Sequence, residues 1–482
     1  MPSADNFAIS QLHEDLLIRV IQTLLSGTRG GRQVQLPTRE QRTHLRGVCR
    51  RWNRIVLDSP MLWKEVELRV QSTHQATLDD ELRRLRFSLD RGGDVMRHLV
   101  LNIDAPLAET NATPLLDAIR AEQNWVHVSI TSSGASISSS LFAPLQPSHP
   151  ISPWRFLRFL HIAEPQVLSI VPQVCSFNLS PEDAPALREV VAGIGAGDLR
   201  QCILPWGQLS HISLGPFANN VSDYLEVLSR CLRAEKCVFE PPAWATRDEL
   251  PPAVDNTLSS PLPIRSFCIQ FPRFTSRATA LMDRLSTPEL KELSLSSTSL
   301  DVASDVGAIQ SAERLIRRSM CNITALQLGV NNLGPRNPEL LAPILNAVSE
   351  SLLSLSLVMY GAATSYFTTV APGLPRLKVL QLVNTGHPLI IWRDSDVGNV
   401  VRWAQTWTSS ISAVLPEGQL SKRKDETHLT YVWISEPNVG FFNLHKNPDY
   451  CRNGRSDTTH PAVQQLNEDG WHLDIIVVGP GS

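Results

Sequence analysis

A six-residue pattern of apolar and polar positions recurs along most of the chain. Each copy has apolar side chains at its first, fourth and sixth positions, as in Leu377-Lys-Val-Leu-Gln-Leu382. Alternate residues of a strand share one face, so the last two apolar positions predict a short strand with one buried face. Eleven copies occur, and they begin at Met96, Trp125, Leu157, Leu187, Leu209, Ala234, Ile264, Leu290, Ile323, Leu352 and Leu377.

Helical patterns precede several of these predicted strands. Four leucines spaced four, three and four residues apart predict an amphipathic helix, and a glycine pair at 92–93 ends it. These leucines are Leu78, Leu82, Leu85 and Leu89. Similar helices are predicted at 115–122, 224–232, 278–285, 309–319 and 340–350. One helix and one short strand cannot bury their own apolar faces, so neighbouring units must stack.

The copies follow one another at intervals of 22 to 33 residues. Leucine-rich repeats have a similar strand signature and run about 20–29 residues. The body of the chain therefore resembles an irregular leucine-rich-repeat protein. The resemblance implies an α/β fold, a solenoid of helix–strand units with a parallel sheet on its concave face. The alternative is an ordinary α/β domain, which is less favoured because eleven copies occur at similar spacing.

The first seventy residues predict further helices. Apolar residues between 12 and 25 recur on one helical face. A second helix is predicted to begin at Thr38, whose spacing to Gln41 is that of a capping box, and to continue to Val56. Pro60 then favours a short helical turn. The core of such a segment is too small to be stable alone, so a partner or the rest of the chain must cover it.

Three motifs in this segment resemble an F-box in their order. The family pattern opens with Leu-Pro-x-Glu-x-Leu, continues with Val-Cys-Arg-x-Trp and closes with Pro-x-Leu-Trp. This chain has Leu12-His-Glu-Asp-Leu-Leu17, Val48-Cys-Arg-Arg-Trp52 and Pro60-Met-Leu-Trp63. His13 stands where the family has proline, and residues 26–38 make a longer loop than usual. The similarity covers about 50 residues.

The resemblance implies a docking module. F-box domains bind the Skp-type adaptor of SCF-type (cullin-RING) ubiquitin ligases, and the domain that follows binds a target for ubiquitin-dependent degradation. Such a substrate receptor is not an enzyme, and neither catalytic residues nor a cofactor are expected. By position, the resemblance places adaptor contacts at Leu12, His13, Leu16, Leu17, Ile21, Trp52 and Trp63. For the two tryptophans, the alternative to adaptor contact is a purely internal packing role.

Two other functions remain open. One is a ligase-independent interaction scaffold with a degenerate F-box, which His13 and the long loop favour. The other is an α/β hydrolase, but the chain has no Gly-x-Ser-x-Gly, no phosphate-binding Gly-Lys-Ser/Thr and no His-Glu-x-x-His. The run Gly193-Ile-Gly-Ala-Gly197 lacks the nucleotide-binding spacing.

Charge and composition limit the kinds of partner that we expect for this chain. The 44 Lys and Arg residues balance 47 Asp and Glu residues, which argues against general nucleic-acid binding. The second helix is basic, and we interpret its arginines as a solvated face: Arg39, Arg42, Arg46, Arg50, Arg51 and Arg54. No apolar run approaches 18 residues, so no membrane span is expected. Eight cysteines without a Cys-x-x-Cys pair, and no secretory signal, favour reduced thiols in the cytoplasm or nucleus.

Four histidines flank the apolar positions of early copies of the pattern. They are His98, His127, His161 and His211. Because these histidines occupy equivalent positions in the repeated pattern, we expect them to form one stack on the concave face. We regard that stack as a candidate binding surface for a target protein. The alternative is an ordinary solvated strand face.

The tail departs from the repeat spacing. A helix is predicted over 396–415, and strands over 429–434, 441–444 and 473–478, which suggests a cap for the last repeat. The histidines and the cysteine of this region are too widely spaced to predict a metal site. The predicted domains are an F-box-like segment at 8–68, a solenoid at 75–384 and a cap at 385–482.

Overall fold

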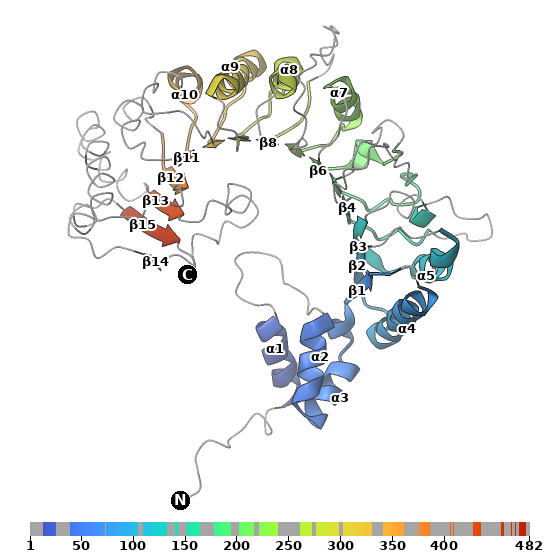
Figure 1. Ribbon diagram of the computed structural model, residues 1–482. Coiled ribbons are helices and arrows are strands. Elements are labelled where there is room, and N and C mark those ends of the chain that lie inside the picture. The colour runs from blue at the N-terminus through green and yellow to red at the C-terminus, as the bar shows by residue number, and fades with distance from the viewer. Residues whose placement is uncertain are drawn as a thin grey trace, which may run out of the picture. The chain divides into compact units, whose positions relative to one another are not determined.

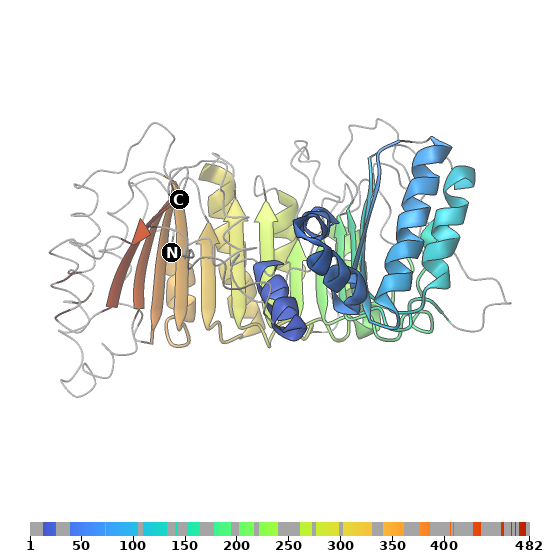
Figure 2. The same cartoon turned by 90° about the horizontal axis from the view of Figure 1, so that it is seen from below.

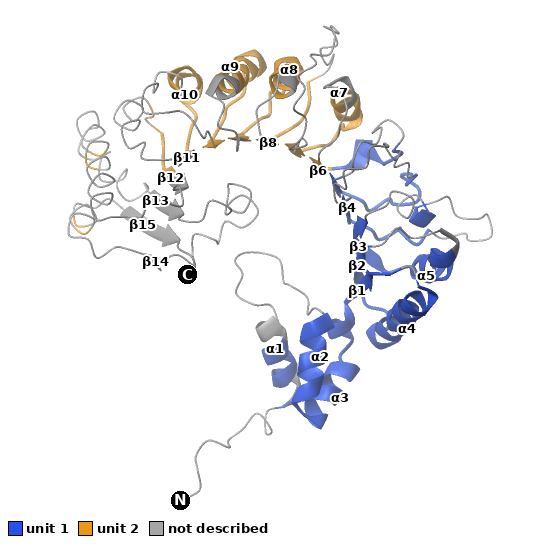
Figure 3. Ribbon diagram, viewed as in Figure 1, with its two compact units in different colours: residues 1–209 blue, residues 210–482 orange. Residues whose placement is uncertain are grey.

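A computed structural model of the chain shows helices and strands that alternate along the sequence (Figure 1). It divides into two compact units, residues 1–209 and 210–482 (Figure 3). The boundaries predicted at 68, 75 and 384 fall inside these units and stay predictions. The structure describes residues 13–25, 39–72, 74–104, 109–132, 140–142, 152–163, 178–193, 202–215, 221–239, 261–271, 276–297, 302–329, 341–360, 374, 376–385, 405, 408, 428–434, 455–456, 464, 468 and 472–478.

The first unit begins with short helices. They are α1 (Glu14–Leu25), α2 (Arg39–Val48), α3 (Arg50–Asp58) and the 3-10 turn η3 (Pro60–Trp63). The prediction of one continuous second helix is wrong, because Cys49 has an extended backbone (φ −163°, ψ 170°) and separates α2 from α3. The break turns Trp52 and Ile55 into the core while Val48 stays exposed. Thr38 of the predicted capping box lies outside the described residues.

Parallel strands of the first unit lie side by side in sequence order. They are β1 (Glu65–Val70), β2 (Arg97–Ile103), β3 (Trp125–Ser132), β4 (Phe159–Ala163) and β5 (Glu189–Gly193). Each strand pairs in parallel with the next. β1 begins inside the segment that resembles an F-box, and a single residue separates it from η3.

Two helices cover one face of this sheet, α4 (Gln75–Gly92) and α5 (Glu109–Ala121) (Figure 1). α4 confirms the helix predicted from the leucine spacing, and its Leu78 and Leu85 are buried. It ends at Gly93, whose φ of 54° lies in the left-handed region that glycine adopts at little cost. The indole Nε1 of Trp125 donates a 2.9 Å hydrogen bond to the carbonyl of Ile119, which ties β3 to α5.

The second unit repeats the alternation. Its first strands are β6 (His211–Leu214), β7 (Lys236–Phe239), β8 (Ser266–Phe271), β9 (Glu292–Ser297), β10 (Ala325–Gly329), β11 (Ser354–Tyr360) and β12 (Val379–Thr385). Its helices are α7 (Val221–Arg230), α8 (Ser276–Arg284), α9 (Val302–Ser319) and α10 (Ala342–Val348). Neighbouring strands pair in parallel, and these helices share one face of them (Figures 1 and 2).

All eleven copies of the apolar pattern form strands, which confirms the helix–strand prediction. The register aligns their apolar positions: Leu293, Leu326 and Leu355 are Cα partners on successive strands, and each is buried. Full burial of such a leucine stabilises the fold by about 1.5–3 kcal/mol. The chain is therefore a mixed α/β protein built from helix–strand solenoid units.

The tail extends the sheet of the second unit. β13 (His428–Ile434) pairs in parallel with β12, and β15 (His472–Val478) pairs in parallel with β13. These contacts confirm the strands predicted at 429–434 and 473–478, and the cap predicted at 385–482 stays a prediction. The two-residue strand β14 (Arg455–Ser456) lies antiparallel to β15. The predicted strand at 441–444 and nearly all of the predicted helix at 396–415 lie outside the described residues.

Candidate functional site

The N-terminal helices enclose a small apolar core. Its buried side chains are Leu17, Ile21, Trp52, Ile55, Val56, Leu62 and Trp63. The indole Nε1 of Trp63 donates a 2.7 Å hydrogen bond to the carbonyl of Val56, so its polar atom is satisfied within the core. α1, α3 and η3 thus form one packed cluster.

Four of the seven predicted adaptor contacts belong to this core. They are Leu17, Ile21, Trp52 and Trp63, and all are buried by the chain itself. In the chain they pack the helices against one another. Their predicted contact with an adaptor stays a prediction. Leu12 lies outside the described residues.

α1 also has an exposed apolar stripe. Leu16 is 48% exposed and Val20 is 41% exposed, and the two lie one helical turn apart. His13 directly precedes the helix and is exposed, and its backbone carbonyl accepts hydrogen bonds from the N–H groups of Leu16 and Leu17. The stripe is therefore held on an ordered helix, with the core on the other side.

Arg42 joins α2 to the start of the first sheet. It is only 5% exposed, and its Nη1 donates to the carbonyls of Leu62 (3.2 Å) and Glu65 (3.0 Å). Its guanidinium also lies 5.2 Å from the ring centre of Trp63. Burial lowers the pKa of Arg42 below its ordinary value. The prediction that Arg42 lies on a solvated face is wrong, because its contacts with η3 and β1 are not visible in the local sequence.

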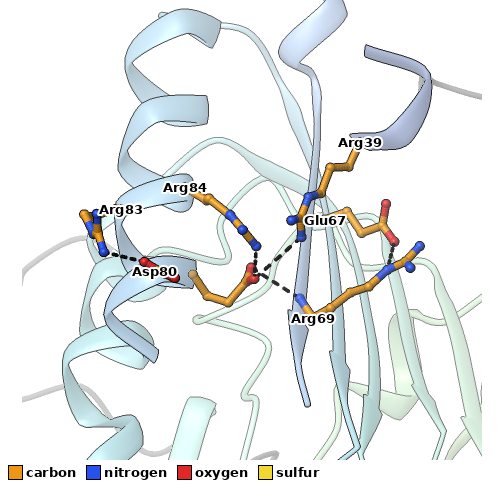
Figure 4. Close-up of polar contacts among 7 residues, drawn as sticks. Arg39, Glu67, Arg69, Asp80, Arg83 and Arg84 are labelled. Atoms are coloured by element: carbon orange, nitrogen blue, oxygen red, sulfur yellow. Dashed lines mark hydrogen bonds and ion pairs between the residues drawn. The ribbon is translucent and has the colours of Figure 1, made fainter. Parts of the chain in front are cut away.

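A charged cluster joins α4 to α2 and β1 (Figure 4). Glu81 of α4 is buried, and its carboxylate pairs with Arg84 and, at 3.6 Å, with Arg39. It also accepts a 3.4 Å hydrogen bond from the backbone N–H of Arg69, whose side chain binds Glu67 at 2.6 Å. A buried carboxylate needs such partners. Glu81 therefore connects three elements at the joint between helices and sheet.

Two of the predicted histidines stack on the first sheet, on the half-buried positions of the strands. The register places His98 beside His127, with ring centres 5.1 Å apart and planes 17° from parallel. His127 stacks in turn on Phe159, at 4.1 Å. We call these three side chains the aromatic row. Phe159 was not among the residues predicted for this face, because the prediction followed the histidines alone.

The predicted single stack of four histidines is corrected. His161 follows Phe159 by two residues on β4, so it lies in the next row, where its Nδ1 is 2.8 Å from the hydroxyl of Ser129. His211 belongs to β6 of the second unit, and its Nδ1 is 2.9 Å from the hydroxyl of Ser210.

Burial changes the ionisation of groups along the aromatic row. It lowers the pKa of His98 and of His127 to about 4, and nearby basic groups add to the effect. Both rings are therefore neutral at pH 7. Glu65 is the Cα partner of His98 on β1, and burial raises the pKa of its carboxyl to about 7 against the opposing effect of Arg42.

Within the described ranges, no group of three or more His, Cys, Asp or Glu side chains is arranged to hold a metal ion. No helix in the described part of the chain has the length and apolar character needed to cross a membrane. Comparison with models of known families gives no match, and comparison with curated proteins gives none either. Any functional assignment therefore rests on this chain's own residues.

Proposed function

We propose that this protein is a non-enzymatic F-box-type substrate receptor of an SCF-type cullin-RING ubiquitin ligase. Its N-terminal helices dock on a Skp-type adaptor, and its repeat strands bind a target protein. The observation that carries the proposal is the two-sided character of α1, which buries Leu17 and Ile21 and exposes Leu16 and Val20. An amphipathic helix of this kind suits an apolar groove on a partner.

The aromatic row supports the second half of the proposal. His98, His127 and Phe159 present neutral, half-buried rings beside one another on the first sheet. Aromatic side chains of this kind contribute much of the binding energy at protein interfaces. A target segment that packs on the row would exclude water from rings that already carry no charge.

The α1 stripe provides the test. Leu16→Asp and Val20→Asp are expected to abolish binding to a purified Skp-type adaptor, since loss of a central apolar contact costs about 2 kcal/mol or more. Both side chains are exposed, so the variants are expected to keep the wild-type circular dichroism spectrum. Isothermal titration calorimetry measures the affinity.

Leu232→Asp is the matched control, because Leu232 is an exposed leucine of the second unit and its replacement is expected to leave affinity unchanged. A wild-type chain that forms no adaptor complex would contradict the proposal and favour a ligase-independent scaffold. Equal affinity in the α1 variants would show that the adaptor binds elsewhere.

A further inference from the structure

An arginine-rich cleft of about 510 Å³ lies between α2 and α4. Clefts of roughly 300–1,000 Å³ are the size that binds small ligands. Three arginines of α2 line it, Arg39, Arg42 and Arg46, and Arg83 and Arg84 line it from α4. None of the residues that line the cleft belongs to α1, so the cleft is distinct from the proposed docking surface.

The cleft carries an excess of positive charge. Two carboxylates, Glu67 and Asp80, line it together with the five arginines. A third carboxylate, Glu81, lies behind them and binds Arg39 and Arg84. An excess of two positive charges remains, which matches the charge of about −2 on a phosphate monoester at neutral pH. Arginine is also the residue that binds phosphate oxygens in a two-pronged manner.

Two of these arginines keep donors for a ligand. Arg46 uses its Nε to bind the side-chain oxygen of Asn53 at 3.0 Å, and Arg83 pairs with Asp80 through one terminal nitrogen. A guanidinium has five N–H donors. In the described part of the chain, each of the two therefore retains N–H groups outside these bonds, and both residues line the cleft (Figure 4 shows Arg83 and its carboxylate partner).

An aromatic wall accompanies the charge. Phe87 of α4 is 39% exposed and lines the cleft, and its ring meets Trp63 edge to face at 5.3 Å between centres. A simple inorganic anion would make no use of this exposed ring. A phosphate attached to an aromatic group would contact both the arginines and the ring.

We propose that this cleft binds an aryl phosphate, with the phosphate on Arg46 and Arg83 and the aromatic ring on Phe87. The same chemistry is present in a free aryl phosphate and in a phosphotyrosine side chain. The proposal does not rest on the function proposed above, because none of its residues belongs to the stripe of α1.

Titration of the full-length protein with phenyl phosphate tests the proposal, at constant ionic strength and by calorimetry. We expect saturable binding that is tighter than that of inorganic phosphate. Arg46→Gln combined with Arg83→Gln is expected to weaken binding about tenfold or more, since charged hydrogen bonds are lost. Exposed ion pairs contribute little to stability, so the double variant is expected to fold. Arg83→Gln alone provides a second, milder variant.

Arg86→Gln is the matched control, because Arg86 is an exposed arginine of α4 outside the cleft, and its replacement is expected to leave affinity unchanged. No binding of phenyl phosphate at millimolar concentration, or equal affinity in the wild type and both cleft variants, would overturn the proposal. Equal affinity for phenyl phosphate and inorganic phosphate would overturn the role of Phe87. A phosphotyrosine peptide that binds more tightly than phenyl phosphate would identify a peptide as the source, and equal affinity would favour a free aryl phosphate.

Discussion

Glu65 carries a carboxyl group whose ionisation opposes folding. Burial raises its pKa to about 7 in the folded chain, from an ordinary value of 4.5. As pH rises from about 4.5 to 7, the unfolded chain loses this proton while the folded chain keeps it, so stability falls and the penalty is complete above pH 7. Glu65→Gln is neutral at every pH. We therefore expect it to raise the Tm at about pH 8 and to leave it nearly unchanged near pH 4.5.

Thermal denaturation at the two pH values measures this difference. Glu292→Gln serves as the control, because Glu292 is exposed at the start of β9, and no pH-dependent gain is expected there. A gain for Glu65→Gln that is the same at both pH values would mean that packing, not ionisation, is responsible.

His98 and His127 give the opposite pH dependence. Their pKa is lowered to about 4 from an ordinary 6.5, so the unfolded chain takes up protons first as pH falls. Stability is then lost between about pH 6.5 and 4. Replacing both with phenylalanine keeps the stacked row but removes the titration. The double variant is expected to lose less Tm between pH 7 and pH 5 than the wild type.

The control for this experiment is His44→Phe, which changes an exposed histidine of α2. It is expected to leave the pH dependence of the Tm as it is in the wild type. Identical pH profiles for the double variant and the wild type would contradict the neutral, buried state of the two rings.

At the scale of elements, Arg42 connects α2, η3 and β1. Arg42→Met removes the donors that serve the buried carbonyl of Leu62 and the partly buried carbonyl of Glu65, and leaves both without that partner. Each unsatisfied buried group costs about 1–3 kcal/mol, so urea denaturation is expected to show a loss of at least that size. Arg46→Met, on the exposed side of α2, is expected to stay within about 0.5 kcal/mol of wild type. Equal losses in the two variants would contradict a special role for Arg42.

The strands were predictable because the local pattern of apolar positions shows both where each strand lies and which of its faces is buried. Even the copy that begins at Ala234, which has a cysteine at its fourth position, forms β7. The break at Cys49 was not predictable, since cysteine does not by itself end a helix, and the break accompanies the burial of Trp52 in the N-terminal core. β1 is not among the eleven copies of the pattern, and its pairing with β2 is a contact between distant segments that the sequence alone does not show.

The candidate site shows a similar limit. The F-box resemblance marks Leu16 and Leu17 together, but neighbouring residues of a helix point in directions about 100° apart, and here Leu17 faces the core while Leu16 is exposed. The resemblance does not specify which of the two faces the core. The row of His161 was mispredicted for a similar reason. A shift of two residues along a strand keeps a side chain on the same face of the sheet but moves it to the next row.

At the scale of the molecule, β1 belongs both to the F-box-like segment and to the sheet. Deletion of residues 1–70 would remove β1 and leave the N–H and C=O groups along one side of β2 without their partner strand. Exposed strand edges of this kind promote aggregation. We expect the truncated chain to aggregate, and a chain that lacks only residues 1–12 to elute as the full chain does in size-exclusion chromatography. A monodisperse fragment from residue 71 onward would contradict this dependence.

The position of Lys64, alone between η3 and β1, has one more consequence. The ends of a flexible linker sample a range of distances that grows with the square root of the linker's length. A linker of a single residue allows almost no such variation in distance. A molecule that binds both α1 and the first strands would therefore meet its second site at an effective concentration set by rigid geometry. Inserting a Gly-Ser spacer beside Lys64 would replace that geometry with chain statistics, and the advantage would decline as the spacer lengthens.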